Sequence, residues 1–235
     1  MTFRSSVDPS SSRRQSLKAT LDEVPLSKIV LIGLVGLALA SVIGELSLWG
    51  SVKSIDEAIF HSAVPAIQSV PGLVDVSVHV TKMGSIPVNY GMAIGIGFYG
   101  GLQRRSWYLP IAVVGSLFAG HVFQILVDRI VEGTVPADYV LGGSAGPFFS
   151  GGVMRVTLMV GMAATLALPP SKDRVVWSLA VAFGIVEGFT RLALGRHWPL
   201  DIVAGFPVGL GLLWLFRQAV ASWRDGWRTR ASDER

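Results

Sequence analysis

The sequence predicts an all-α fold, a polytopic membrane helical bundle of about six transmembrane helices. Hydrophobic residues make up 51% of the 235 positions and charged residues 15%, whereas about a quarter of the residues in soluble domains are charged. Several apolar stretches approach the roughly 17 to 25 residues that a helix needs to cross the hydrocarbon of a bilayer. These stretches cover about residues 29–49, 86–101, 108–127, 153–168, 175–194 and 202–216.

The remaining segments divide the chain into one membrane domain and two tails. Residues 1–28 are rich in serine and arginine and cannot build a core, so we expect a disordered cytoplasmic tail. The membrane domain is expected over residues 29–218, with a basic cytoplasmic tail at 219–235. The apolar spacing within residues 50–74 favours a short helix lying in the membrane interface, and the glycine- and proline-rich residues 132–152 favour a loop.

The positions of the basic residues predict the orientation in the membrane. The net charge is +4, but the charges gather at span borders, which favours a bilayer and not nucleic acid as the partner. If the spans alternate, the basic residues before the first span, after the last, and at Arg104, Arg105, Lys172 and Arg174 all lie on one side. By the positive-inside rule both termini are then cytoplasmic, and the corner before the last span lies at the outer face.

A polar corner between the fifth and sixth apolar stretches, residues 191–201, is the strongest candidate for chemistry. Gly195 is expected to end one helix, and Pro199 suits the first turn of the next. Asp201 would then lie about one helical turn from His197, where its carboxylate can orient the imidazole.

The same corner carries cationic groups. Arg191 and Arg196 offer multidentate donors, and a helix N-terminus adds partial positive charge, a combination that favours a phosphate. The alternative is that His197 and Asp201 only cap a helix while the arginines contact lipid headgroups. Ionisable residues at membrane depth are costly, which favours a functional role.

The spacing of arginine, five residues, histidine, three residues and aspartate resembles the third signature of the type 2 phosphatidic acid phosphatase superfamily, which includes lipid phosphate phosphatases and bacterial polyprenyl diphosphate phosphatases. Thr190 stands where that signature usually has serine. The resemblance implies that His197 attacks phosphorus to form a phosphohistidine, that Asp201 orients it, and that Arg191 binds phosphoryl oxygens.

The second signature, Pro-Ser-Gly-His, corresponds here to residues 149–152. Ser150 and Gly151 match, and their backbone N–H groups are expected to form an anion-binding nest at a helix start. Gly152 replaces the histidine that protonates the leaving oxygen in the family, so the resemblance implies the loss of a general acid. Arg155, one turn into the helix, supplies positive charge but is a poor proton donor.

The first signature, a lysine, six residues and then Arg-Pro, is the least similar of the three. Arg129 lies near the lysine position, and Val135 replaces the arginine before Pro136. The resemblance therefore implies at most one cationic contact, from Arg129, whereas an ion pair of Arg129 with Asp128 or Glu132 is an equal alternative. Weaker features extend the resemblance over roughly residues 55–216.

These observations lead to a functional expectation. The chain is expected to be a lipid phosphatase or phosphotransferase of the bacterial cytoplasmic membrane, acting on a lipid (polyprenyl) phosphate or diphosphate without metal or other cofactor. Hydrolysis of a diphosphate is expected to suffer less from the loss of the general acid than hydrolysis of a phosphomonoester, because phosphate is a better leaving group than an alkoxide. The alternative is a catalytically impaired relative that binds, carries or senses a phospholipid or polyprenyl phosphate.

Overall fold

The computed structural model describes residues 50–131 and 148–233 and the isolated positions 39, 42, 43, 136 and 141, with side chains up to residue 221. Every regular element in these ranges is a helix, and the predicted all-α membrane fold is confirmed. The predicted tail 1–28, the predicted first span 29–49 and most of the predicted loop 132–152 lie outside the described residues.

The helices begin and end close to the predicted borders. In chain order they are α3 (Gly50–Gln68), α4 (Leu73–Val80), the 3-10 turn η1 (Thr81–Gly84), α5 (Ile86–Arg104), α6 (Tyr108–Ile130), α7 (Gly151–Ala167), η2 (Pro170–Lys172), α8 (Asp173–Ala193) and α9 (Pro199–Asp233). The last helix is longer than the predicted span 202–216 and includes most of the predicted tail 219–235.

Three of these helices are long and apolar enough to cross a membrane: α6, α8 with η2, and α9 up to Ala221. A fourth candidate is the pair formed by α3 and α4–η1, which is bent by 108° at its break, and α7 is a shorter apolar helix. Large apolar side chains lie exposed on α5, α6 and α8, including Ile94, Phe98, Ile111, Phe118 and Ile185. The chain is therefore an integral membrane protein, and the count of six spans stays a prediction.

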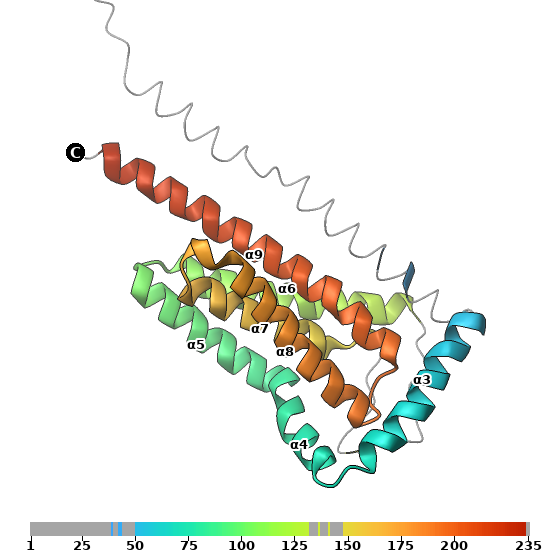
Figure 1. Ribbon diagram of the computed structural model, residues 1–235. Coiled ribbons are helices and arrows are strands. Elements are labelled where there is room, and N and C mark those ends of the chain that lie inside the picture. Colours follow the sequence, from blue (N-terminus) through green and yellow to red (C-terminus); the bar gives the residue numbers. More distant parts are fainter. Residues whose placement is uncertain are drawn as a thin grey trace, which may run out of the picture.

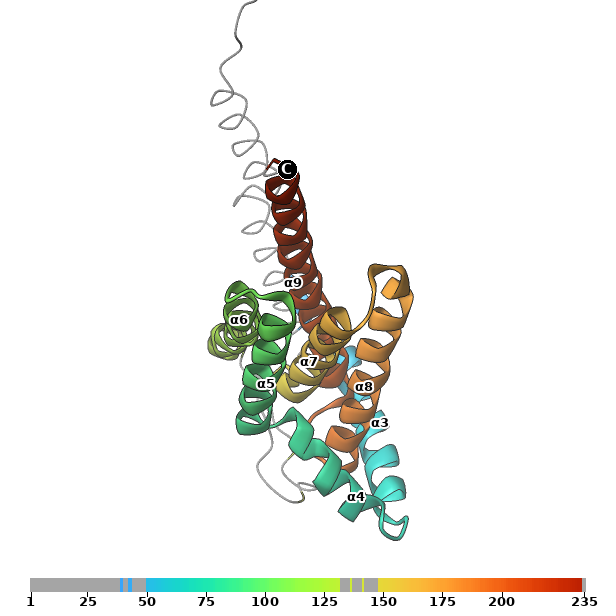
Figure 2. The same ribbon diagram turned by 90° about the vertical axis from the view of Figure 1, so that its left-hand side faces the viewer.

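Helix α7 forms the centre of the bundle. It packs against α8 and α9 on one side and against α5 and α6 on the other (Figure 2). All its residues are buried except Val160, Ala163, Thr165 and Ala167. Gly209 lets α9 approach closely, because a Cβ at that position would lie 2.8 Å from the Met154 carbonyl oxygen.

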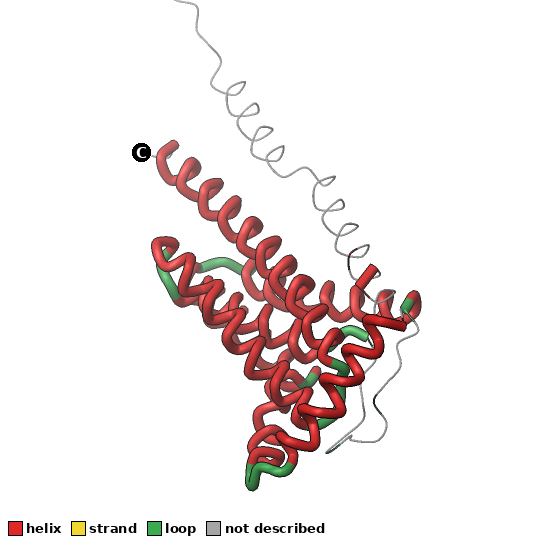
Figure 3. Tube along the Cα trace, turned by 45° about the vertical axis from the view of Figure 1, so that its right-hand side comes forward, coloured by secondary structure: helices red, strands yellow, loops and turns green. Residues whose placement is uncertain are grey.

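Hydrogen bonds join neighbouring helices at both ends of the bundle. At one end, the N–H of Ser150, just before α7, donates to the carbonyl of Asp201 in α9 at 2.9 Å. At the other end, Arg104 Nη2 of α5 donates to the Leu166 carbonyl of α7 at 2.8 Å. The helix α3 and the short α4 lie beside the first end, at the lower right of the bundle (Figure 1). The described loops join the helices at these ends (Figure 3).

Candidate functional site

The corner between α8 and α9 has the local structure that the sequence predicts. Gly195 adopts a left-handed conformation with φ of 63°. The N–H of Arg196 donates to the Arg191 carbonyl at 3.0 Å and the N–H of Gly195 to the Leu192 carbonyl at 2.9 Å, the pair of bonds that defines a Schellman C-cap. Helix α9 begins at Pro199, as expected. This turn fixes the backbone position of His197 between the two helices.

His197 and Asp201 lie side by side in a buried position. Their exposed fractions are 3% and 5%, and His197 Nδ1 lies 3.5 Å from Asp201 Oδ2. That distance exceeds the roughly 2.9 Å of an ordinary hydrogen bond, so the groups are adjacent without a closed bond. Asp201 Oδ2 also accepts the Trp198 N–H at 3.2 Å, which holds the carboxylate at the start of α9.

The environment of His197 favours its neutral form. Burial lowers the pKa of the imidazole, and the positive charges of Arg191 and Arg155 lower it further, while the Asp201 carboxylate raises it in part. The net effect lowers the pKa of His197 from the ordinary imidazole value of 6.5. A neutral imidazole keeps the lone pair that a nucleophile needs.

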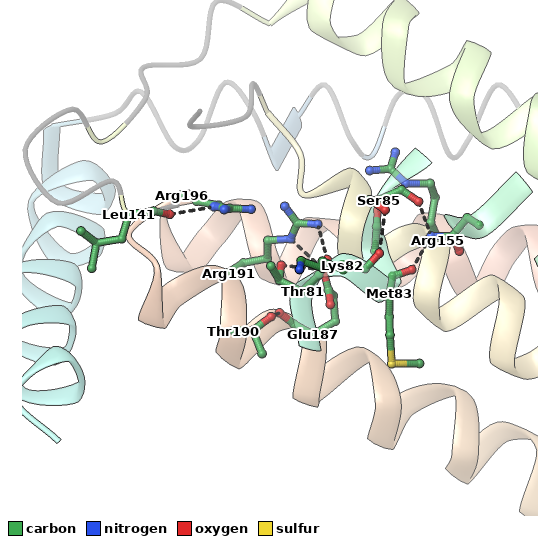
Figure 4. Close-up of polar contacts among 12 residues, drawn as sticks. Thr81, Lys82, Met83, Ser85, Leu141, Arg155, Glu187, Thr190, Arg191 and Arg196 are labelled. Carbon is green, nitrogen blue, oxygen red and sulfur yellow. Dashed lines mark hydrogen bonds and ion pairs between the residues drawn. The ribbon is translucent and has the colours of Figure 1, made fainter. Parts of the chain in front are cut away.

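Arg191 is held by a buried carboxylate that the sequence analysis did not single out. Its Nε donates to Glu187 Oε1 at 2.7 Å, and Glu187 is 1% exposed. The hydroxyl of Thr81 donates to the same oxygen at 3.3 Å, and Arg191 Nη2 donates to the Thr81 carbonyl at 3.5 Å. The close-up in Figure 4 shows this group of Thr81, Glu187 and Arg191 at the contact between η1 and α8.

Arg155 reaches the same turn from α7. It is 7% exposed, its Nε donates to the Gly84 carbonyl at 2.9 Å, and its Nη1 donates to Gln124 Oε1 at 3.0 Å. The turn η1 therefore contacts both guanidinium groups, Arg191 near its start and Arg155 near its end (Figure 4). Two cations from different helices are thereby brought together at one end of the bundle.

The expected backbone nest is corrected in part by the structure. The N–H of Ser150 donates to the Asp201 carbonyl, so it is not free for an anion. A side chain at Gly151 would overlap the Gln124 amide, which explains the glycine. Three buried polar atoms of this corner have no hydrogen-bond partner among the described residues: Ser150 Oγ, Glu187 Oε2 and His197 Nδ1.

Gly152 lies directly against the buried ion pair. A Cβ at this position would be 2.5 Å from Arg191 Nη2, 2.6 Å from Arg191 Nε and 2.7 Å from Glu187 Oε1. A Cβ at Gly84 would also overlap Glu187. The space that a histidine would need at position 152 is therefore filled by Glu187 and Arg191.

One predicted cation is not part of this group, and another contacts a different segment of the chain. Arg129 is exposed in the last turn of α6 and makes no hydrogen bond or ion pair within the described ranges. Arg196 donates from Nε to the Leu141 carbonyl at 3.2 Å, one contact of this side chain with the segment before α7. The structure thus brings together His197, Asp201, Arg191, Arg155, Ser150 and Gly151, and leaves Arg129 aside.

Sequence reasoning missed Glu187 and Gln124, although one of them carried a signal. Glu187 is an acidic residue inside an apolar span and precedes Arg191 by four positions, the spacing of a helical ion pair. Gln124 had no such signal. In the described part of the chain, no group of three His, Cys, Asp or Glu side chains is arranged to hold a metal ion.

Comparisons with known proteins agree with this fold. Residues 131–225 match the family model of the PAP2 superfamily. Phosphatidylglycerophosphatase B of Bacillus subtilis (strain 168) is 27% identical over 179 residues, which cover 71% of this chain and 84% of the relative. Undecaprenyl-diphosphatase BcrC of the same organism is 22% identical over 99 residues, 42% of each chain.

A solved structure shares the architecture. The crystal structure of a transmembrane PAP2 type phosphatidylglycerolphosphate phosphatase from Bacillus subtilis superposes with a TM-score of 0.70 at 20% identity, covering 80% of this chain and 96% of that one. At this identity the match shows a shared fold alone. The resemblance to the type 2 phosphatidic acid phosphatase superfamily is confirmed.

Proposed function

Because this integral membrane protein resembles the PAP2 superfamily, we propose that it is a lipid phosphatase that hydrolyses a lipid phosphate or diphosphate at the corner of His197. The two named relatives act, by their names, on phosphatidylglycerophosphate and undecaprenyl diphosphate. The chemistry common to both is a phosphate that stays at the membrane surface while its hydrocarbon tail remains in the bilayer. That substrate class fits a site at one end of a helical bundle.

The observation that carries the proposal is the buried imidazole of His197 beside the Asp201 carboxylate, in surroundings that favour its neutral form. With Nδ1–H turned toward Asp201, the lone pair of Nε2 is available to attack phosphorus. As the P–N bond forms, the P–O bond to the leaving group breaks and its electron pair goes to the leaving oxygen. The phosphohistidine formed in this way carries positive charge on the ring, and the carboxylate 3.5 Å from Nδ1 stabilises it. Water then attacks the phosphorus, the P–N bond breaks, and the imidazole is regenerated.

The guanidinium groups supply the complement to the phosphoryl charge. Arg191 uses two of its five N–H donors for Glu187 and Thr81 within the described structure. The others remain for phosphoryl oxygens, where negative charge builds up in the transition state. Arg155, which contacts the same turn, and the N-terminal end of α7 add further positive potential.

The basic residues support a site on the outer face of the bacterial cytoplasmic membrane. Arg104, Arg105, Lys172 and Arg174 follow or precede the ends of α5, α7 and α8 that lie opposite the His197 corner. By the positive-inside rule that end faces the cytoplasm. The proposed orientation then places a lipid phosphate of the outer leaflet within reach of Arg191.

The test is phosphate release from dioleoyl phosphatidate and from undecaprenyl diphosphate by the purified full-length protein in lipid nanodiscs. Hydrolysis that His197→Ala abolishes, with an acid-labile phosphate trapped on the wild-type protein, supports the proposal. The matched control is His79→Ala, because His79 is exposed and bonds only to the Asp75 carbonyl of its own helix among the described contacts.

Three other results would replace the proposal. Transfer of the phosphoryl group to a second lipid would make the protein a phosphotransferase. Binding of the lipid without turnover would favour the non-catalytic alternative. Hydrolysis that persists in His197→Ala would remove the imidazole from the mechanism.

A further inference from the structure

Glu187 lies in the space that a side chain at residue 152 would need. The carboxylate oxygen Oε1 comes within 2.7 Å of where a Cβ at Gly152 would be. It reaches that position from α8, the helix that also carries Arg191. Glycine at position 152 therefore has two effects. It removes the histidine as a proton donor, and it leaves the space that the Glu187 carboxylate fills.

Structural stabilisation alone does not explain this carboxylate. A buried ion pair is weak evidence for stability, because apolar residues of the same volume often serve as well or better. Here the pair requires small residues at two contacts, Gly84 and Gly152. Its second oxygen, Oε2, is buried and has no hydrogen-bond partner among the described residues, although such atoms in folded proteins are normally paired.

The neighbours of Glu187 explain how it can be charged in one state and carry a proton in another. Without substrate, Arg191 and Thr81 compensate the negative charge of Oε1. A phosphate that binds Arg191 competes with that carboxylate for the guanidinium donors. Two negative groups close together in a buried site cost free energy, and a proton on the carboxyl relieves that cost.

We propose that Glu187 is the general acid and base of this protein and replaces the histidine that position 152 lacks. This inference rests on the proposed phosphatase function. His197 Nε2 forms the bond to phosphorus, the P–O bond to the leaving group breaks with its electron pair, and the Glu187 proton passes to the leaving oxygen. In the second step water attacks phosphorus, the P–N electron pair returns to the imidazole, and the Glu187 carboxylate takes the water proton.

A general acid at this place widens the substrate class. A lipid phosphomonoester leaves as an alkoxide and depends strongly on protonation, whereas a diphosphate leaves as phosphate and depends on it less. With Glu187 as the acid, the protein hydrolyses lipid phosphomonoesters as well as diphosphates. The expectation from Gly152 alone, that diphosphates are the tolerated substrates, is then too narrow.

The decisive measurement compares one variant on two leaving groups. Wild-type protein, Glu187→Gln and the partly exposed control Glu57→Gln are assayed in nanodiscs on dioleoyl phosphatidate and on p-nitrophenyl phosphate, whose leaving group needs no proton. Glutamine keeps the size and the acceptor for Arg191 but carries no transferable proton. We expect kcat on phosphatidate to fall by about 10²- to 10⁴-fold and kcat on p-nitrophenyl phosphate to fall less than about tenfold.

An equal loss on both substrates assigns Glu187 a positioning role for Arg191 and overturns the inference while the phosphatase function stands. No loss on either substrate overturns it as well. Wild-type protein that hydrolyses undecaprenyl diphosphate but not phosphatidate overturns the role of Glu187 as the acid while the phosphatase function stands. Release of phosphate from none of these substrates overturns the proposed function, and the role of Glu187 with it.

A second pair of variants tests whether a histidine at position 152 can take over the proton transfer proposed for Glu187. Gly152→His alone forces a side chain against Arg191 and Glu187, so activity falls on both substrates. Combining it with Glu187→Ala removes one of the two overlapping side chains and releases Arg191 from its ion pair, so that the guanidinium group can move aside. We expect the double variant to hydrolyse phosphatidate at least tenfold faster than Glu187→Ala alone. A double variant no faster than Glu187→Ala counts against the replacement of one group by the other.

Discussion

Replacing Arg191 by methionine removes the charge that compensates Glu187 and keeps most of the side-chain volume. Glu187 is 1% exposed and its Oε1 lies 2.7 Å from Arg191 Nε, so the variant leaves a buried carboxylate without its main partner. Breaking a buried pair in this way costs about 3 to 5 kcal/mol. At about 2 to 4 °C per kcal/mol for a chain of this size, the thermal midpoint should fall by about 6 to 20 °C.

The assay is thermal unfolding in detergent, followed by tryptophan fluorescence. The double variant Glu187→Leu/Arg191→Met removes both charges and should recover most of the loss. Lys53→Met is the matched control, because Lys53 and Glu57 form an exposed pair at 3.8 Å that contributes no more than about 1 kcal/mol. A midpoint for Arg191→Met equal to that of the control, or a double variant less stable than the single one, would refute the reasoning.

Four more outcomes follow from the corner between α8 and α9. Asp201→Asn should lower kcat by about 10- to 100-fold in the phosphate-release assay, since a hydrogen bond to a charged group contributes about 1.5 to 3 kcal/mol; an unchanged rate would exclude Asp201 from orienting the imidazole. Because burial lowers the pKa of His197 below the ordinary imidazole value of 6.5, the acid limb of kcat/KM should lie below pH 6.5. The unfolded chain takes up that proton first, so His197 makes stability fall as pH drops through 6.5, and His197→Gln should weaken this dependence of the thermal midpoint. Gly195→Ala should cost about 1 kcal/mol because of its φ of 63°, whereas Gly95→Ala in α5, with open space around it, should not destabilise.

The helices and the turn before α9 could be predicted because their causes are local. Apolar stretches of nearly span length gave α5 to α8 within a few residues of their borders. Gly195 and Pro199 indicated the end of one helix and the start of the next, and the interval of four residues put Asp201 beside His197. Each of these inferences depends on interactions within one or two helical turns.

The surroundings of Gly152 required the tertiary structure. As a sequence position, Gly152 indicated only a missing proton donor, because nothing in its neighbourhood along the chain points to residue 187. The contact arises because α7 packs against α8, and a shift of one residue between these helices would separate the two groups. The backbone nest expected at Ser150 failed for the same reason, since its N–H is used by the Asp201 carbonyl of another helix.

The sequence by itself therefore determined that this chain is a helical membrane protein and that one corner carries an oriented imidazole next to an arginine. Only the tertiary structure decided that Arg191 pairs with Glu187, that Arg155 is held by Gly84 and Gln124, and that Arg129 stands apart. The physical reason is the distance along the chain over which each interaction acts. Hydrophobic periodicity and helix caps depend on residues a few positions apart, whereas the packing of the helices decides which partners a buried charge has.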